Sequence, residues 1–112
     1  MSLKLIIRDE VGIITIDREK SLNALNKQVL KEILKTLNKF IKSKDVKVIC
    51  ITGRGDKAFI AGADIKEMSK LDSKSASRFG ELGQRVMNTI ENSPKPVISI
   101  INGYAFGGGC EI

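Results

Sequence analysis

Residues 46–65, VKVICITGRGDKAFIAGADI, decide how the rest of the chain is arranged. The apolar run 46–52 is short and rich in β-branched residues, which predicts a strand that is buried if helices cover its two faces. A turn is predicted at 53–56, and a bend of small residues at 59–63. Asp64 then stands where its side chain can cap a short helix.

Strands and helices alternate on both sides of this stretch. The predicted strands are 3–8, 12–17, 46–52 and 97–101, and the predicted helices are 27–43, 65–69 and 73–91. Asn26 is the expected N-cap of the first helix, and the prolines at 94 and 96 end the last one. This order predicts one α/β layer with parallel strand pairs, on which the two long helices pack.

A second stretch, NGYAFGGGCE at 102–111, has a turn followed by three glycines that lead toward a helix. Three consecutive glycines would weaken the interior of any helix or strand. They suit a place where the backbone approaches a ligand, or a tight turn with close strand–helix packing. Both 58–65 and 102–111 lead into a helix N-terminus, where unpaired N–H groups can stabilise an oxygen that gains charge during a reaction.

Composition narrows the chemistry further. The 112 residues are 42% hydrophobic and carry a net charge of +6, but they contain no histidine, so acid–base catalysis must rest mainly on carboxylates. The positive charge suits a polyanion such as coenzyme A, or a lysine-rich solvated surface. The few aromatic residues are not interleaved with basic ones, which argues against binding of nucleic acid.

Cys50 and Cys110 are expected to be buried free thiols. No signal peptide or membrane span is predicted, and a cytoplasmic location is expected.

Three segments resemble one family. AFIAGADIKEM (58–68) and NGYAFGGGCE (102–111) resemble the signature segments of enoyl-CoA hydratases in the crotonase superfamily, and VGIITIDREKSLNAL (11–25) resembles the family's N-terminal hairpin and coenzyme A loop. The resemblance covers essentially the whole chain in the same order. It implies the crotonase-like (ClpP/crotonase) β-β-α spiral fold, of which residues 1–112 are expected to be the incomplete N-terminal part, either as a fragment of a longer chain or as a natural short product with altered function.

The resemblance also implies roles for single residues. The amides of Ala63 and Gly108 match the two donors of the oxyanion hole, and Glu111 matches the first of two catalytic glutamates. The residues that it assigns to coenzyme A binding are Arg18, Lys20, Ser21, Leu22, Ala24, Ala61, Ala63, Asp64 and Ile65. Alternatives stay open: Arg18 and Lys20 suit a phosphate or a solvated loop, and a first-turn glutamate is favoured by the helix dipole alone. Asp64 is interpreted as a structural cap, and Glu67 as a residue on a helix surface.

The implied reaction is syn addition of water to a trans-2-enoyl-CoA, giving a 3-hydroxyacyl-CoA in fatty acid metabolism. The thioester is the substrate, and no metal or redox cofactor is implied. The second glutamate is expected beyond Ile112, so the 112 residues alone are expected to be inactive. The full-length parent is expected to be a homotrimer or hexamer with no nucleic-acid or membrane partner. An isomerase, an acyl-CoA hydrolase and a non-catalytic acyl-CoA-binding or assembly module remain alternatives.

Overall fold

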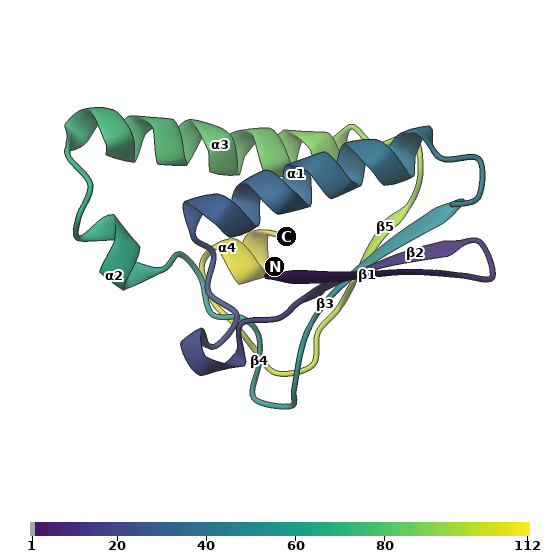
Figure 1. The fold of residues 1–112 in the computed structure, drawn as a ribbon, viewed down its shortest axis with the longest axis horizontal. Helices are drawn as coiled ribbons and strands as arrows, with labels where there is room; N and C mark the ends of the chain where they lie inside the picture. Colours follow the sequence, from purple (N-terminus) through teal and green to yellow (C-terminus); the bar gives the residue numbers. More distant parts are fainter. Residues whose placement is uncertain (1) are drawn as a thin grey trace.

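A four-stranded sheet in the order β1-β2-β3-β5 forms the base of the molecule (Figure 1). The structure, a computed structural model, describes residues 2–112. The strands are β1 (Leu3–Arg8), β2 (Val11–Ile16), β3 (Val48–Gly53) and β5 (Val97–Ile100). β1 pairs with β2 antiparallel, whereas β2 with β3 and β3 with β5 are parallel. The prediction that these four strands share one sheet is therefore confirmed.

The hairpin between β1 and β2 sets the register of the sheet. Asp9 and Glu10 form a two-residue turn with positive φ angles of 50° and 68°, as a type I′ turn requires. The Glu10 carbonyl accepts hydrogen bonds from the Lys47 amide at 2.7 Å and the Val48 amide at 3.3 Å. The turn thus anchors the start of β3, and Val11 lies opposite Val48.

Two long helices lie on one side of the sheet. α1 (Lys27–Lys42) packs on β1 and β2, and its predicted N-cap is confirmed because the Asn26 side chain accepts from the Val29 amide at 2.8 Å. α3 (Ser73–Glu91) packs mainly on α1, on the side away from the sheet (Figure 1). The prediction that both helices pack directly on the sheet is therefore wrong for α3. The physical reason is that the apolar face of α3 packs on α1, and only Val86 of α3 is fully buried.

The core is a single cluster of buried apolar side chains between α1 and the sheet. Its members are Leu3, Ile14, Ile16, Leu25, Val29, Leu30, Ile33, Leu37, Phe40, Val46, Ile49, Ile51, Phe59, Ile60 and Val86. No helix among residues 2–112 is long and apolar enough to span a membrane.

A second, two-stranded parallel sheet pairs β4 (Ala58–Ile60) with β6 (Tyr104–Ala105). The predicted bend over 59–63 is wrong for its first two residues, and β6 was not predicted. Both strands are too short to show an alternating pattern, and pairing with a distant segment decides their conformation. The short helices α2 (Ile65–Met68) and α4 (Gly108–Glu111) follow these strands, as predicted, and a 3₁₀ turn, η1 (Glu19–Ser21), follows β2.

The face of the large sheet opposite α1 is apolar and open over the described residues. Ile6, Ile13, Cys50 and Ile98 stand in one row across the four strands. The outer members of this row, Ile6 and Ile98, are 54% and 50% exposed. β5 is an edge strand of this sheet over residues 2–112.

The two cysteines lie in different environments. Both thiols are free, and Cys50 is buried in the sheet as predicted. Cys110 is exposed, so the prediction that it is buried is wrong. The neighbouring Gly109 takes the buried position of α4 against β4, which turns Cys110 toward the surface.

Candidate active site

Two backbone amides without an acceptor stand beside one cavity of about 210 Å³. Ala63 and Gly108 line this cavity together with Glu111, and apolar side chains, including those of Leu30 and Phe79, form much of its wall. Within residues 2–112, neither the Ala63 amide nor the Gly108 amide donates a hydrogen bond. The structure therefore brings the three predicted catalytic positions to one place.

Ala63 is fixed by a short parallel bridge to Leu25. The Leu25 amide donates to the Gly62 carbonyl at 2.7 Å, and the Asp64 amide donates to the Leu25 carbonyl at 2.8 Å. These bonds use the groups on either side of Ala63 and leave its own N–H free. Gly62 allows this path because its φ of 101° lies in the left-handed region.

Gly108 is fixed by the contact between α4 and β4. The Phe106 amide donates to the Ile60 carbonyl at 3.1 Å, and Gly107 turns the chain with a φ of 47°. A Cβ at Gly109 would lie 2.9 Å from the Ile60 carbonyl carbon and closer still to its oxygen. Close strand–helix packing therefore accounts for Gly109 and the turn for Gly107, whereas Gly108 presents a free amide.

An ion pair next to Ala63 joins two loops. The Arg18 guanidinium donates to the Asp64 carboxylate at 3.0 Å and to the Ala24 carbonyl at 2.5 Å. The two side chains are only 18% and 15% exposed. The hydrogen bond from Arg18 holds the pKa of Asp64 below its ordinary value, against the smaller opposing effect of burial. Arg18 is thus tied to Asp64 rather than solvated in a loop, and its assignment to coenzyme A binding stays a prediction.

The expected capping role of Asp64 is confirmed, because its carboxylate accepts from the Glu67 amide at 3.3 Å. Glu67 was interpreted as a residue on a helix surface, but it also makes a hydrogen bond to another helix. Its carboxylate accepts from the Lys27 amide at 3.0 Å and so satisfies the N-terminus of α1. The two acidic residues connect α2 to α1 and to the Arg18 loop.

The remaining predicted coenzyme A residues lie in two groups. Lys20 and Ser21 line a shallow surface hollow beside Arg18, which shares no lining residue with the 210 Å³ cavity. Leu22 and Ile65 are exposed, Ala24 is buried, and Ala61 is half-buried. Lys20 forms no ion pair within residues 2–112. The binding roles of these residues stay predictions.

Asn23 is a positioning residue that the sequence reasoning missed. Its side chain is buried, with 1% of the residue exposed, and donates to the carbonyls of Arg54 at 3.1 Å and Ala58 at 2.9 Å. Its carbonyl oxygen accepts from the Arg18 amide at 2.9 Å. Asparagine tolerates the positive φ of 54° found here, and that preference in a polar loop was the available signal.

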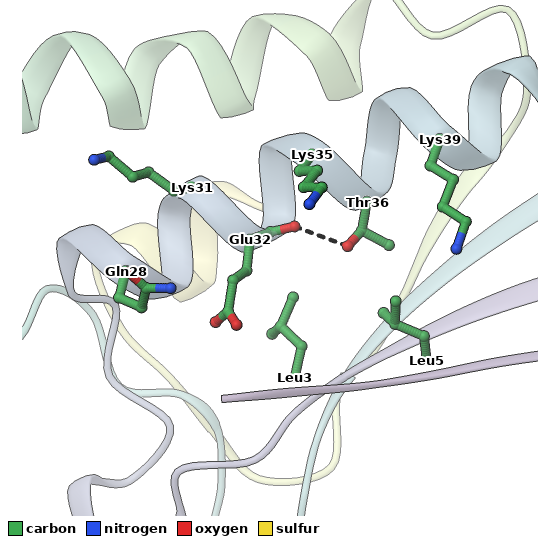
Figure 2. Close-up of a pocket in the computed structure, with 8 residues that line it drawn as sticks. All are labelled: Leu3, Leu5, Gln28, Lys31, Glu32, Lys35, Thr36 and Lys39. Carbon is green, nitrogen blue, oxygen red and sulfur yellow. Dashed lines mark hydrogen bonds between the residues drawn. The ribbon is translucent and has the colours of Figure 1, made fainter. Parts of the chain in front are cut away.

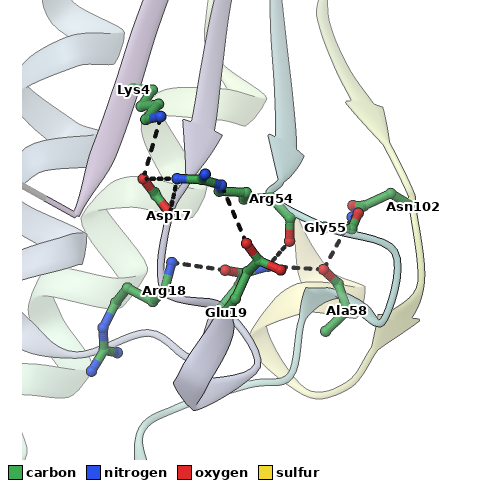
Figure 3. A network of polar contacts seen from close by, with 9 residues as sticks. Lys4, Asp17, Arg18, Glu19, Arg54, Gly55, Ala58 and Asn102 are labelled. Atoms are coloured by element: carbon green, nitrogen blue, oxygen red, sulfur yellow. Dashed lines mark hydrogen bonds and ion pairs between the residues drawn. The ribbon is translucent and has the colours of Figure 1, made fainter.

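A polar network holds the loops after β2 and β3 together (Figure 3). Arg54 donates to both carboxylate oxygens of Asp17, at 3.1 and 2.9 Å, and lies 3.2 Å from the Glu19 carboxylate. On the other side, the Asn102 side chain donates to the carbonyls of Gly55 at 2.7 Å and Ala58 at 3.2 Å. The start of β4 is thus fixed by two asparagines that come from distant loops.

No cluster of His, Cys, Asp or Glu side chains within residues 2–112 could hold a metal ion. The chemistry that the described residues offer is that of two free amides and one carboxylate at a largely apolar cavity. Such an arrangement can bind an oxygen that becomes negatively charged and can exchange a proton beside it.

Comparisons with known proteins place the chain in a family. The enoyl-CoA hydratase/isomerase family matches residues 7–112. A short-chain-enoyl-CoA hydratase of Clostridium acetobutylicum is 44% identical over 103 residues, which are 92% of this chain and 40% of that protein. A crotonyl-CoA hydratase of Syntrophomonas wolfei is 45% identical over 104 residues, with 93% and 40% covered. The chain spans about 40% of the length of these relatives.

Solved structures of enoyl-CoA hydratases share the fold of this chain. An enoyl-CoA hydratase from Bacillus anthracis superposes with a TM-score of 0.94 at 32% identity, over 99% of this chain and 43% of that one. An enoyl-CoA hydratase from Thermoplasma volcanium gives a TM-score of 0.90 at 37% identity, over 97% and 43%. The expected crotonase-like fold is confirmed over the described residues.

Proposed function

This chain belongs to the enoyl-CoA hydratase/isomerase family, and we propose that it supplies the oxyanion hole and one acid–base glutamate of an enoyl-CoA hydratase. The proposed reaction adds water to a trans-2-enoyl-CoA and gives a 3-hydroxyacyl-CoA. The observation that carries the proposal is the presence of two free amides, those of Ala63 and Gly108, and of Glu111 at one cavity. The names of the relatives make crotonyl-CoA the first substrate to test.

The two amides stabilise the thioester oxygen. Addition of water at the β-carbon moves negative charge onto this oxygen, so donors fixed in advance stabilise the transition state more than the bound substrate. The backbone bonds of Gly62, Asp64 and Phe106 hold these donors in place before the substrate arrives. Apolar side chains around the cavity strengthen each hydrogen bond by excluding water.

Glu111 orients the attacking water and accepts its proton. Its position on α4 places it three residues after the Gly108 amide, at the same cavity. The proton for the α-carbon comes, in this proposal, from a second carboxylate beyond residue 112. The coenzyme A moiety lies along the loop that contains Arg18, Lys20 and Ala24, where Lys20 offers a cation for a phosphate. A trimeric or hexameric assembly and a cytoplasmic location stay further expectations.

The test uses the complete gene product that contains these residues, incubated with crotonyl-CoA. We expect loss of the enoyl absorbance and formation of 3-hydroxybutyryl-CoA. A shifted double bond would indicate an isomerase, and release of free coenzyme A would indicate a hydrolase. Glu111→Gln is expected to reduce turnover about 100-fold or more. Glu81→Gln, on the exposed side of α3, is the matched control and is expected to leave turnover unchanged. Normal turnover in Glu111→Gln would contradict the proposal.

A further inference from the structure

A second cavity, of about 420 Å³, lies between β1 and α1 (Figure 2). Leu3 and Leu5 of β1 form its apolar floor, and Lys31, Lys35 and Lys39 of α1 form its rim. It shares no lining residue with the cavity at Ala63, Gly108 and Glu111. The proposed hydration reaction gives it no role.

β1 borders this cavity and is an edge strand, because β2 is its only neighbour in the sheet over residues 2–112. The Asp17 amide donates to the Ser2 carbonyl at 2.7 Å, and the turn at the other end of the hairpin has two residues. In an antiparallel ladder, these constraints direct the backbone groups of the even-numbered residues of β1 toward β2. The N–H and C=O groups of Leu3, Leu5 and Ile7 therefore point outward and are free to pair with another strand.

The lysines above this edge have no anionic partner. Lys31, Lys35 and Lys39 are exposed, and none of them forms an ion pair within residues 2–112. They recur every four residues, which spaces them by about 6 Å along the helix. Alternate residues of a β-strand are about 6.6 Å apart. A strand with acidic residues at every second position therefore matches the spacing of this lysine row.

Glu32 places a carboxylate oxygen without a hydrogen-bond donor inside the cavity. The side chain extends from α1 toward Leu3, and one carboxylate oxygen, Oε2, is buried without a donor in the described part of the chain (Figure 2). A buried carboxylate oxygen without a hydrogen bond is costly, so an incoming N–H or O–H group would stabilise it.

We propose that β1 and α1 form a docking site for an extended acidic peptide. The peptide adds to the sheet as a strand beside β1 and pairs with the outward backbone groups of Leu3, Leu5 and Ile7. Its acidic side chains point to the α1 side of the sheet, above Leu3 and Leu5, and meet Lys35 and Lys39, while its apolar side chains point to the opposite side, beside Ile6. Charge complementarity selects the peptide, and the backbone pairing fixes its register.

The first experiment measures binding of a fluorescein-labelled peptide of four Glu-Val repeats to the complete gene product by fluorescence anisotropy. A peptide of four Lys-Val repeats, with the same β-propensity pattern and the opposite charge, is the control and should not bind. Two further acidic peptides carry N-methyl groups on every glutamate or on every valine. Only one edge of an added strand pairs with β1, so one of these two peptides should lose binding and the other should keep it.

The second experiment changes the protein. Lys35→Glu combined with Lys39→Glu should weaken binding of the Glu-Val peptide at least tenfold, whereas Lys74→Glu on α3 should not. Leu5→Pro removes one outward N–H without removing a bond to β2, and should also weaken binding at least tenfold. Circular dichroism and turnover check that each variant is folded, independently of peptide binding.

Several results would overturn the proposal. Absence of binding, equal binding of both N-methylated peptides, or unchanged binding by the double lysine variant would each exclude it. If an RNA oligonucleotide binds through the lysine row, and Leu5→Pro does not weaken that binding, the lysines form a general site for polyanions. A dimer that Leu5→Pro dissociates would assign the edge to a second copy of the chain.

Discussion

The guanidinium of Arg18 lies 3.0 Å from the carboxylate of Asp64, a residue 46 positions further along the chain. Asp64 directly follows Ala63, the first of the two free amides, and caps α2 through the Glu67 amide. Arg18 also holds the Ala24 carbonyl beside the Leu25 bridge. This pair therefore fixes both the residue that follows the proposed oxyanion donor and the segment at Leu25 to which that donor is bridged.

Replacing Asp64 by Asn should destabilise the protein by about 1–3 kcal/mol, the usual range for losing a hydrogen bond to a charged group in a mostly buried place. Asparagine keeps the capping oxygen but loses the charge that pairs with Arg18. Urea unfolding of the complete gene product at pH 7 measures the change. Asp45→Asn removes the same charge at an exposed site without an ion pair, and should change stability by less than about 0.5 kcal/mol. Equal effects of the two variants would show that the pair contributes nothing.

The contribution of Asp64 should also depend on pH. Its pKa in the folded protein is lowered by Arg18, so the unfolded chain binds the proton more readily. The stabilisation is therefore complete above the ordinary aspartate pKa of about 3.9, and is lost as the pH falls through the lower folded value. The stability difference between the parent and Asp64→Asn should stay constant from neutral pH to about pH 5 and shrink below pH 4. A difference that grows on acidification would contradict this assignment.

Two glycine-to-alanine changes should act in opposite directions. At Gly109, an added Cβ would collide with the Ile60 carbonyl, so α4 must move away from β4. We expect a loss of about 1–3 kcal/mol, as for overpacked sites, and a displaced Glu111 with about 100-fold lower turnover. At Gly80 on α3, an added Cβ meets no atom within 4 Å, and stability should rise by about 0.5–1 kcal/mol. Thermal unfolding and turnover measure both changes, and a tolerated Gly109→Ala would show that α4 is not fixed by this contact.

Replacing Asn23 by Ala should cost about 3 kcal/mol, because buried carbonyls and an amide lose their partners and alanine disfavours a positive φ. The groups left without a side-chain partner are the carbonyls of Arg54 and Ala58 and the amide of Arg18. The free energy of unfolding of Asn23→Ala is compared with that of Asn38→Ala, an exposed position on α1. Similar values for the two variants would contradict the role given to Asn23.

Local patterns in the sequence predicted the main elements well. The apolar faces of α1 and α3, the caps at Asn26 and Asp64, and the four strands of the large sheet all follow from spacing and from turn residues. The segments around Ala63 and Gly108 could be singled out because their glycines and small residues would weaken a helix or strand and suit a close approach of the backbone to a ligand. Their meeting at one cavity depends on the pairing of β4 with β6, which no local pattern revealed.

The polar contacts between loops could not be predicted for a related reason. Arg18 and Asp64, like Asn102 and Ala58, come together only because the sheet brings distant loops to one end. In the sequence, Arg18 is one basic residue in a polar loop, and nothing in its neighbourhood indicates an aspartate partner. Likewise, Cys110 follows a glycine run, and only the packing of Gly109 on β4 decides that it is exposed.

In the proposed mechanism, the Gly108 amide binds the thioester oxygen in the transition state. The most direct test of this role compares the turnover of Gly108→Pro with that of Gly108→Ala. Both variants place a carbon 2.9 Å from the Leu25 side chain, which must shift, but only proline removes the N–H. Proline also suits the first position of a helix. We predict turnover of crotonyl-CoA at least about 100-fold lower in folded Gly108→Pro than in Gly108→Ala. Equal turnover in the two variants would contradict the account.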